Sequence, residues 1–184
     1  SQMDKLKYTG AYCHNDMDML VVGMYGKGGN DYIAAGGCTD EEYQTHFSLW
    51  AMMNSPLMIG CDVRNVSDAA KKILLNRDLI AINQDVECRA PFLLNCVTND
   101  ADLYVMVKVL SNGDLALALF NMGDVPALGA VDFCDFGLPA NAGMALQFYD
   151  CIEHTEAGVW EEVFTTTVPS HGSKVYRCKL VKKP

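Results

Sequence analysis

Two hydrophobic patterns divide the chain into an N-terminal and a C-terminal half. Up to about residue 85, continuous apolar runs alternate with segments whose apolar residues recur at helical spacing. This order is typical of an α/β unit with parallel strands and helical crossovers. The apolar runs at residues 19–23 and 57–61 each predict a strand that is buried on both faces.

Two helices are predicted in the same half. Thr39 and Glu42 have the spacing of a capping box, in which each side chain accepts a backbone N–H from the other end of the first turn. A helix is therefore expected from Thr39 to about Asn54. Ser67 is the expected N-cap of a second helix, which reaches to about Asn76.

Beyond Cys88 the apolar residues occupy every second position, which predicts antiparallel strands. The clearest local prediction is a β-hairpin over residues 103–119, because Asn112-Gly113 suits a tight turn between two such strands. Further short runs predict an antiparallel β-sandwich; they lie near residues 131–136, 145–149, 163–168 and 174–180. We expect an α/β unit over residues 1–88 and an all-β domain over 89–184.

Charge and hydropathy exclude some partners. The 184 residues include 14 Lys and Arg against 23 Asp and Glu, which gives a net charge of −9. This negative field repels a polyphosphate, so nucleic acid is not expected as a ligand. No stretch reaches the roughly 18 uninterrupted apolar residues of a membrane helix. We expect a soluble protein with no membrane partner, and the sequence leaves a cytoplasmic or a secreted location open.

The eight cysteines give no metal-binding pattern. No two of them have the C-x₂₋₄-C spacing of a zinc site, and His14 and His46 have no matching ligand spacing. Several cysteines lie inside apolar runs, for example Cys61, where a buried thiol packs well. Reduced core cysteines are favoured over disulfides, although the even number leaves disulfides open. We expect no metal and no cofactor.

The densest polar cluster lies directly before the first predicted strand. It reads His14-Asn15-Asp16-Met17-Asp18. Residues two apart in a strand point to the same side, about 6.6–7 Å apart along its axis, so Asp16 and Asp18 are candidates for a general acid and base. Aspartates before a strand also accept hydrogen bonds from turn amides. Spacing alone leaves both interpretations open.

Five motifs resemble the family 27 glycoside hydrolases. In this sequence they read YTG and HNDMDMLVVG within residues 8–23, LWAMMNSPL at 49–57, DVR at 62–64, IAINQD at 80–85 and VPSHG at 168–172. The first four follow the order found in that family, which contains retaining α-galactosidases and α-N-acetylgalactosaminidases. The resemblance implies the last two βα units of a (β/α)8 TIM barrel, with residues 19–23 and 57–61 as strands seven and eight, followed by an antiparallel β-sandwich.

The same resemblance implies that the reacting groups are missing. A complete barrel needs about 250 residues, and retaining hydrolysis needs two carboxyl groups about 5–5.5 Å apart. In the family these are aspartates associated with barrel strands four and six, and neither of their motifs occurs in this sequence. We expect the nucleophile and the acid/base upstream of Ser1, assign no catalytic residue in this chain, and expect the chain alone to be inactive.

Four residues are predicted to bind substrate by their match to the family. Asp18 and Met19 correspond to residues that line the galactose pocket, and Asp16 to a supporting carboxylate. His14 stands where the family has tryptophan, which implies altered apolar stacking around the sugar. The glycine-rich segment at residues 26–37 lacks a phosphate-binding pattern and is expected to be a loop on the catalytic face.

The expected ligand is an α-galactoside or a related sugar, and galactose, N-acetylgalactosamine and arabinopyranose are not distinguished. A partial barrel exposes apolar surface, so a complementary barrel fragment or self-association is expected. The alternative function is a non-catalytic carbohydrate-binding or interaction module. Tyr149, Trp160 and Tyr176 are candidates for its sugar-stacking platform, although aromatic residues in such a pattern more commonly belong to the core.

Overall fold

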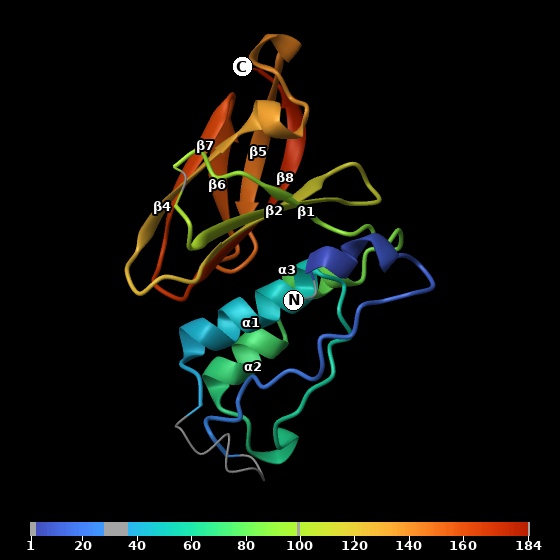
Figure 1. Cartoon of the computed structure of the whole chain (residues 1–184), viewed down its shortest axis with the longest axis vertical. Helices are drawn as coiled ribbons and strands as arrows, with labels where there is room; N and C mark the ends of the chain where they lie inside the picture. The colour runs from blue at the N-terminus through green and yellow to red at the C-terminus, as the bar shows by residue number, and fades with distance from the viewer. Residues whose placement is uncertain (1–2, 28–36, 99, 184) are drawn as a thin grey trace.

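The computed structural model of the chain describes residues 3–27, 37–98 and 100–183 (Figure 1). The N-terminal residues run as irregular chain beside three helices, and the β-strands of the C-terminal half stack against those helices. The helices are α1 (Asp40–Met52), α2 (Asp68–Leu74) and α3 (Arg77–Asn83). Short 3₁₀ segments lie at Met3–Tyr8, Val63–Asn65, Phe133–Phe136 and Ala140–Ala142.

All strands of the C-terminal half pair in antiparallel fashion. They are β1 (Phe92–Leu94), β2 (Leu103–Val109), β3 (Leu115–Asn121), β4 (Ala127–Asp132), β5 (Met144–Asp150), β6 (Thr155–Trp160), β7 (Val163–Val168) and β8 (Ser173–Lys182). Six form one sheet in the order β1-β2-β3-β8-β5-β6, and β4 and β7 form a second sheet. The runs predicted at 145–149, 163–168 and 174–180 are confirmed as β5, β7 and β8. The run predicted at 131–136 is wrong in extent, because β4 ends at Asp132 and a 3₁₀ segment follows, and β1 and β6 were not predicted.

The predicted hairpin is confirmed, but its loop is longer than a two-residue turn. Strands β2 and β3 pair from Leu103↔Asn121 to Val109↔Leu115. Beyond this ladder the amide of Leu110 donates to the carbonyl of Asp114 at 2.8 Å, so three residues form the loop. Gly113 takes a φ of +86° there, which suits the left-handed position of a three-residue hairpin loop.

The predicted capping box of α1 is present, and the second predicted helix is followed at once by a third that was not predicted. Thr39 accepts from the amide of Glu42, and the Glu42 carboxylate accepts from the amide of Thr39 at 2.7 Å. Helix α2 ends at Leu74, two residues before the predicted end. Asn76 then caps α3 by accepting from two amides of its first turn. An asparagine that can satisfy those amides starts a new helix more readily than it ends an old one.

The two predicted buried strands of the α/β half are wrong in extent. The described residues form one parallel bridge between them, Leu20↔Ile59, in which the Leu20 amide donates to Met58 O at 2.7 Å and the Gly60 amide to Leu20 O at 2.9 Å. Val22 and Gly23 lie in a turn instead of a strand. Among the described residues this single bridge is the pairing found between the two runs, so it orders one position of each run and not a full strand.

The six-stranded sheet is covered on both faces, so its two sides build two apolar cores. Leu117 and Leu119 of β3 face the β4–β7 sheet, where Phe148 and Phe164 stack with centroids 4.2 Å apart. The alternate residues Ala118 and Phe120 face the helices. Residues of α1, α2 and α3 therefore share one core with β2, β3 and β8. This shared core fixes the helices relative to the sandwich.

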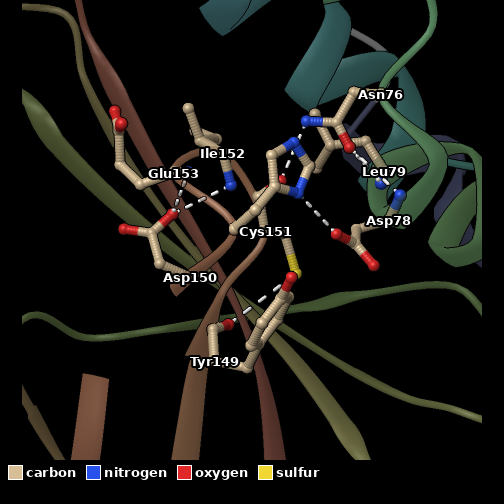
Figure 2. A network of polar contacts seen from close by, with 9 residues as sticks. Asn76, Asp78, Leu79, Tyr149, Asp150, Cys151, Ile152 and Glu153 are labelled. Atoms are coloured by element: carbon tan, nitrogen blue, oxygen red, sulfur yellow. Dashed lines mark hydrogen bonds and ion pairs between the residues drawn. The ribbon is translucent and has the colours of Figure 1, made fainter. Parts of the chain in front are cut away.

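Polar contacts reinforce this junction at the start of α3. Figure 2 shows Asn76 donating its side-chain amide to the carbonyl of Cys151 at 2.8 Å, while its oxygen caps α3. The neighbouring Asp78 carboxylate lies 2.7 Å from Nδ1 of His154, in the turn between β5 and β6. At the other end of α3, Asp85 accepts from the hydroxyl of Ser111 at 2.6 Å. Both ends of α3 are thus tied to the sandwich.

A fully buried lysine crosses the same junction. Lys108 of β2 donates its ammonium to the side-chain oxygen of Asn54 and, at 2.5 Å, to the carbonyl of Ile82. Burial lowers the pKa of Lys108 to about 8, and the charge of Asp85 opposes this shift. The lysine therefore satisfies two oxygen atoms where helices α1 and α3 end, at a cost in desolvation.

We predict that Lys108 makes stability rise with pH. Its pKa is about 8 in the folded chain but about 10.4 when unfolded, so between these values the unfolded state binds more protons. Relative to Lys108→Met, the wild-type free energy of unfolding should therefore increase by about 2–3 kcal/mol between pH 7 and pH 10.5. Urea unfolding at each pH measures the difference. If the free energy of unfolding changes equally with pH in both proteins, the lowered pKa of Lys108 is contradicted.

Candidate functional site

The predicted substrate-binding residues lie on one irregular segment that leads into the Leu20↔Ile59 bridge. His14, Asp16, Asp18 and Met19 belong to this segment, and all four are exposed. The bridge holds its C-terminal end beside residues 58–60. A side-chain carbon at Gly60 would lie 2.7 Å from Met19 Sδ and 2.9 Å from Leu20 O. Glycine at position 60 therefore allows the close approach that places Met19.

The aspartates do not present a carboxylate pair on one side of a strand. Asp16 Oδ1 accepts from the amide of Asp18 at 2.9 Å, and Asp18 Oδ1 accepts from the amide of Met19 at 2.7 Å. Asp18 has a φ of +74°, a conformation that aspartate tolerates because its short side chain bonds the local backbone. Of the two interpretations of the spacing, the one in which aspartates satisfy turn amides matches this geometry.

Helix α1 and the residues after it hold the segment in place. The amide of Val21 donates to Nε2 of His46 at 3.2 Å, and Trp50 Nε1 donates to the carbonyl of Asp18 at 2.9 Å. His46 and Trp50 lie one helical turn apart, with ring centroids separated by 3.9 Å. The amide of Met17 donates to the buried hydroxyl of Ser55 at 3.0 Å.

These three positioning residues were not predicted from the sequence. The sequence indicates for His46 only that it has no metal-ligand spacing. The i, i+4 spacing of His46 and Trp50 on one helix is the signal that was available, because such residues share a helix face. Which segment this face would contact was not readable from spacing.

Nε2 of His46 accepts the hydrogen bond from the Val21 amide, so this nitrogen carries no proton in the structure. Burial lowers the pKa of His46 to about 4, so the ring is neutral at physiological pH. In the neutral ring one nitrogen is an acceptor, whereas both are donors after protonation. The contact to Val21 therefore exists only in the neutral form.

Large apolar side chains are exposed around the bridge. Met19, Met58 and Ile59 are 48%, 63% and 49% exposed. Side chains of a buried strand pair would be covered on both faces. This part of the surface is therefore left open in the isolated chain.

The aromatic residues proposed as a sugar-stacking platform do not share a surface. Tyr176 is buried and, with the half-buried Trp160, packs around Phe164 in the core between the two sheets. Tyr149 packs against the core on the helix side of the sheet. Tyr149 therefore lies on the opposite face of the sheet from Trp160 and Tyr176. The prediction of one platform formed by all three residues is wrong.

Within the described ranges, no three His, Cys, Asp or Glu side chains gather in a metal-binding group. All eight cysteines are free. None of the helices that the structure describes is long and apolar enough to cross a bilayer. Most of the glycine-rich loop predicted at 26–37 lies outside the described residues.

Both halves of the chain match known families. Residues 1–85 match the model described as Melibiase_2, alpha galactosidase A, and residues 100–178 match Melibiase_C, the alpha galactosidase C-terminal beta sandwich domain. The alpha-galactosidase of Coffea arabica is 37% identical over 145 residues, which are 78% of this chain and 37% of the relative. That of Cyamopsis tetragonoloba is 32% identical over 169 residues, 92% of this chain and 37% of the relative.

A solved structure agrees with these relatives. The crystal structure of a Bacteroides fragilis protein assigned as an alpha-galactosidase/melibiase is 35% identical, with a TM-score of 0.84. The match covers 97% of this chain and 37% of the Bacteroides fragilis chain. The order of the two matches defines part of a glycoside hydrolase catalytic domain joined to a C-terminal β-sandwich. The chain belongs to the alpha-galactosidase (melibiase) family, as its motifs predicted, and it spans about 37% of the length of these relatives.

We predict that acid weakens the chain through His46. Its pKa is about 4 when folded and about 6.5 when unfolded, so below pH 6.5 the unfolded state binds more protons and stability falls. His46→Gln keeps an acceptor for the Val21 amide but does not titrate. Between pH 6.5 and 4 the wild type should lose about 1–2 kcal/mol more than this variant, after allowance for solvent screening. Equal losses in urea unfolding would show that His46 is not the sensor.

The contact from Trp50 should order the segment locally. Trp50→Phe removes the hydrogen bond to Asp18 O, which should cost about 1 kcal/mol and speed hydrogen exchange at the amides of Met17 to Leu20. Trp160→Phe is the matched control, because it removes a 2.9 Å bond to Ala157 O within the sandwich. If the amides of Met17 to Leu20 exchange at the same rate in both variants, Trp50 does not position this segment.

Proposed function

We propose that the chain is the C-terminal portion of a retaining α-galactosidase-like enzyme that cleaves terminal α-linked galactose, or N-acetylgalactosamine, from oligosaccharides or glycoconjugates. In this proposal residues 1–88 form the last two βα units of a (β/α)8 barrel, and residues 89–184 form the β-sandwich. The observation that carries it is the pair of family matches, at residues 1–85 and 100–178 in that order. The parallel contact of Leu20 with Ile59 supports the placement of strands seven and eight side by side.

In this enzyme the segment from His14 to Met19 forms part of the sugar pocket. Asp18 uses Oδ1 for the amide of Met19, which leaves Oδ2 to accept a hydrogen bond from a sugar hydroxyl. Asp16 fixes the turn through the amide of Asp18 and so orients that carboxylate. Met19, held beside Gly60, offers apolar contact to the sugar ring, and His14 is exposed on the same segment.

The two carboxyl groups of the retaining reaction come, in this proposal, from barrel strands outside this chain. In Asp16 and Asp18 one carboxylate oxygen already accepts a backbone amide, so these side chains fix the turn and do not present two free carboxyl groups. Their role is positioning and electrostatics. The preceding barrel strands are also the proposed partner of the exposed Met19, Met58 and Ile59, which they would cover.

The activity test compares the chain alone with a fusion. The purified 184-residue chain should not hydrolyse a nitrophenyl α-galactoside above the uncatalysed rate. A fusion to the preceding barrel portion of the Bacteroides fragilis relative should hydrolyse it. In that fusion Asp18→Asn should lower kcat/KM by about 10- to 100-fold, the value of one hydrogen bond to a charged group.

Asp135→Asn is the matched control, because this aspartate lies in the sandwich at residues 133–136 and should leave the rate unchanged. Turnover by the chain alone would contradict the placement of the reacting groups. A folded, active fusion in which Asp18→Asn has no effect would contradict the role of the segment.

A further inference from the structure

A hollow of about 520 Å³ lies on the helix-facing side of the six-stranded sheet, at the β8, β5 and β6 end. Its size is within the range of small-molecule sites, about 300–1,000 Å³. Gln147 and Tyr149 of β5 line it, beside their cross-strand neighbours Lys179 and Arg177 of β8. Glu156 of β6, opposite Tyr149, closes one side. None of these residues belongs to the segment at 14–19.

The two cations of the hollow have unused hydrogen-bond donors. The Arg177 guanidinium lies over the Tyr149 ring, 5.6 Å from its centroid, and this cation–π contact holds its planar donor group in place. Lys179 lies two residues further along the same face of β8. Among the ion pairs formed by the described residues, neither cation takes part. A strand thus presents several N–H donors to the hollow without a protein partner.

Carboxylates supply acceptors on the opposite sides. Asp114, at the start of β3, accepts from the Asn112 side chain at 2.9 Å, and Glu156 accepts from Gln147 at 3.3 Å. Each such bond occupies one carboxylate oxygen and leaves further acceptor capacity. Donors and acceptors therefore surround the same space, and the two positive charges are balanced by two negative ones.

This balance selects against ionic ligands. An anion would gain from Arg177 and Lys179 but would be repelled by Asp114 and Glu156 and by the net charge of −9. A cation would gain from Asp114 and Glu156 but would be repelled by Arg177 and Lys179. A sugar hydroxyl donates and accepts at once, so a neutral polyhydroxylated ring satisfies both kinds of lining group without a charge mismatch.

We propose that this hollow is a binding site for one neutral sugar unit of a glycan. The site does not depend on the proposed hydrolysis, because it is complete within this chain and uses no residue of the segment at 14–19. Arg177 and Lys179 donate to sugar oxygens, Asp114 and Glu156 accept from sugar hydroxyls, and the edge of Tyr149 contacts the ring carbons.

The test is an NMR titration of the ¹⁵N-labelled 184-residue chain with raffinose. Saturable shifts are expected at the amides of residues 147–149, 156 and 177–179. Arg177→Ala and, separately, Lys179→Ala should each weaken binding about 10-fold or more, as expected for loss of charge-assisted hydrogen bonds. Lys182→Ala is the matched control, an exposed lysine of the same strand outside the hollow, and should bind as the wild type does.

Parallel titrations with galacturonate and inorganic phosphate test the charge argument. Binding at the hollow that is weaker for both anions than for raffinose supports the proposal. Tighter binding of either anion overturns it, as does the absence of saturable shifts with raffinose. Shifts confined to residues 14–19 also overturn it, while leaving the proposed galactose pocket supported, so failure of the two proposals is distinguishable.

Discussion

The apolar contact between the helices and one face of the six-stranded sheet is the constraint on which the rest of the structure depends. Ala116 and Ala118 of β3 are fully buried, and these small side chains let helix α1 approach the sheet closely. Phe47 of α1 and Leu79 of α3 complete the same core. Lys108 then satisfies oxygens at the ends of α1 and α3, which adds directional contacts to an interface that apolar packing alone leaves free to slide.

From this interface the order extends to the candidate sugar-binding segment. Helix α1 packs on the sheet through one face and contacts the segment through His46 and Trp50. The aspartates and Met19 thus lie on irregular chain that is positioned by a packed element, the arrangement in which binding residues are usually found. The sandwich has a structural part in the proposed pocket, because it supports the helix that holds the pocket residues.

The sequence predicted those features that local chemistry decides. The capping box at Thr39 and the period-two alternation of β2 and β3 led directly to α1 and the hairpin. The short strands β1 and β6 carry no clean alternation, and they form because longer neighbours offer them backbone partners. Asn76 was predicted as the approximate end of a helix, whereas it starts the next one, and the tertiary bond from its side chain to Cys151 O favours this position.

The candidate site shows the same limit. Motif order identified the family and pointed to Asp16, Asp18 and Met19, whereas the support from His46 and Ser55 depends on contacts 25 and 38 residues away in sequence. Strand propensity over residues 19–23 did not produce a strand, because within the described residues Leu20 alone of this run has a backbone partner across the bridge. The hollow on β5 and β8 is a product of strand register, and no single run of residues reveals it.

Native-state hydrogen exchange tests most directly whether the helices, the sandwich and the segment form one cooperative unit. The account predicts that the slowest amides of α1 and of β3 exchange with the same free energy and the same dependence on denaturant, because loss of their shared core unfolds both. Amides of α1 that exchange through a separate opening of lower free energy, while β3 stays protected, would contradict it.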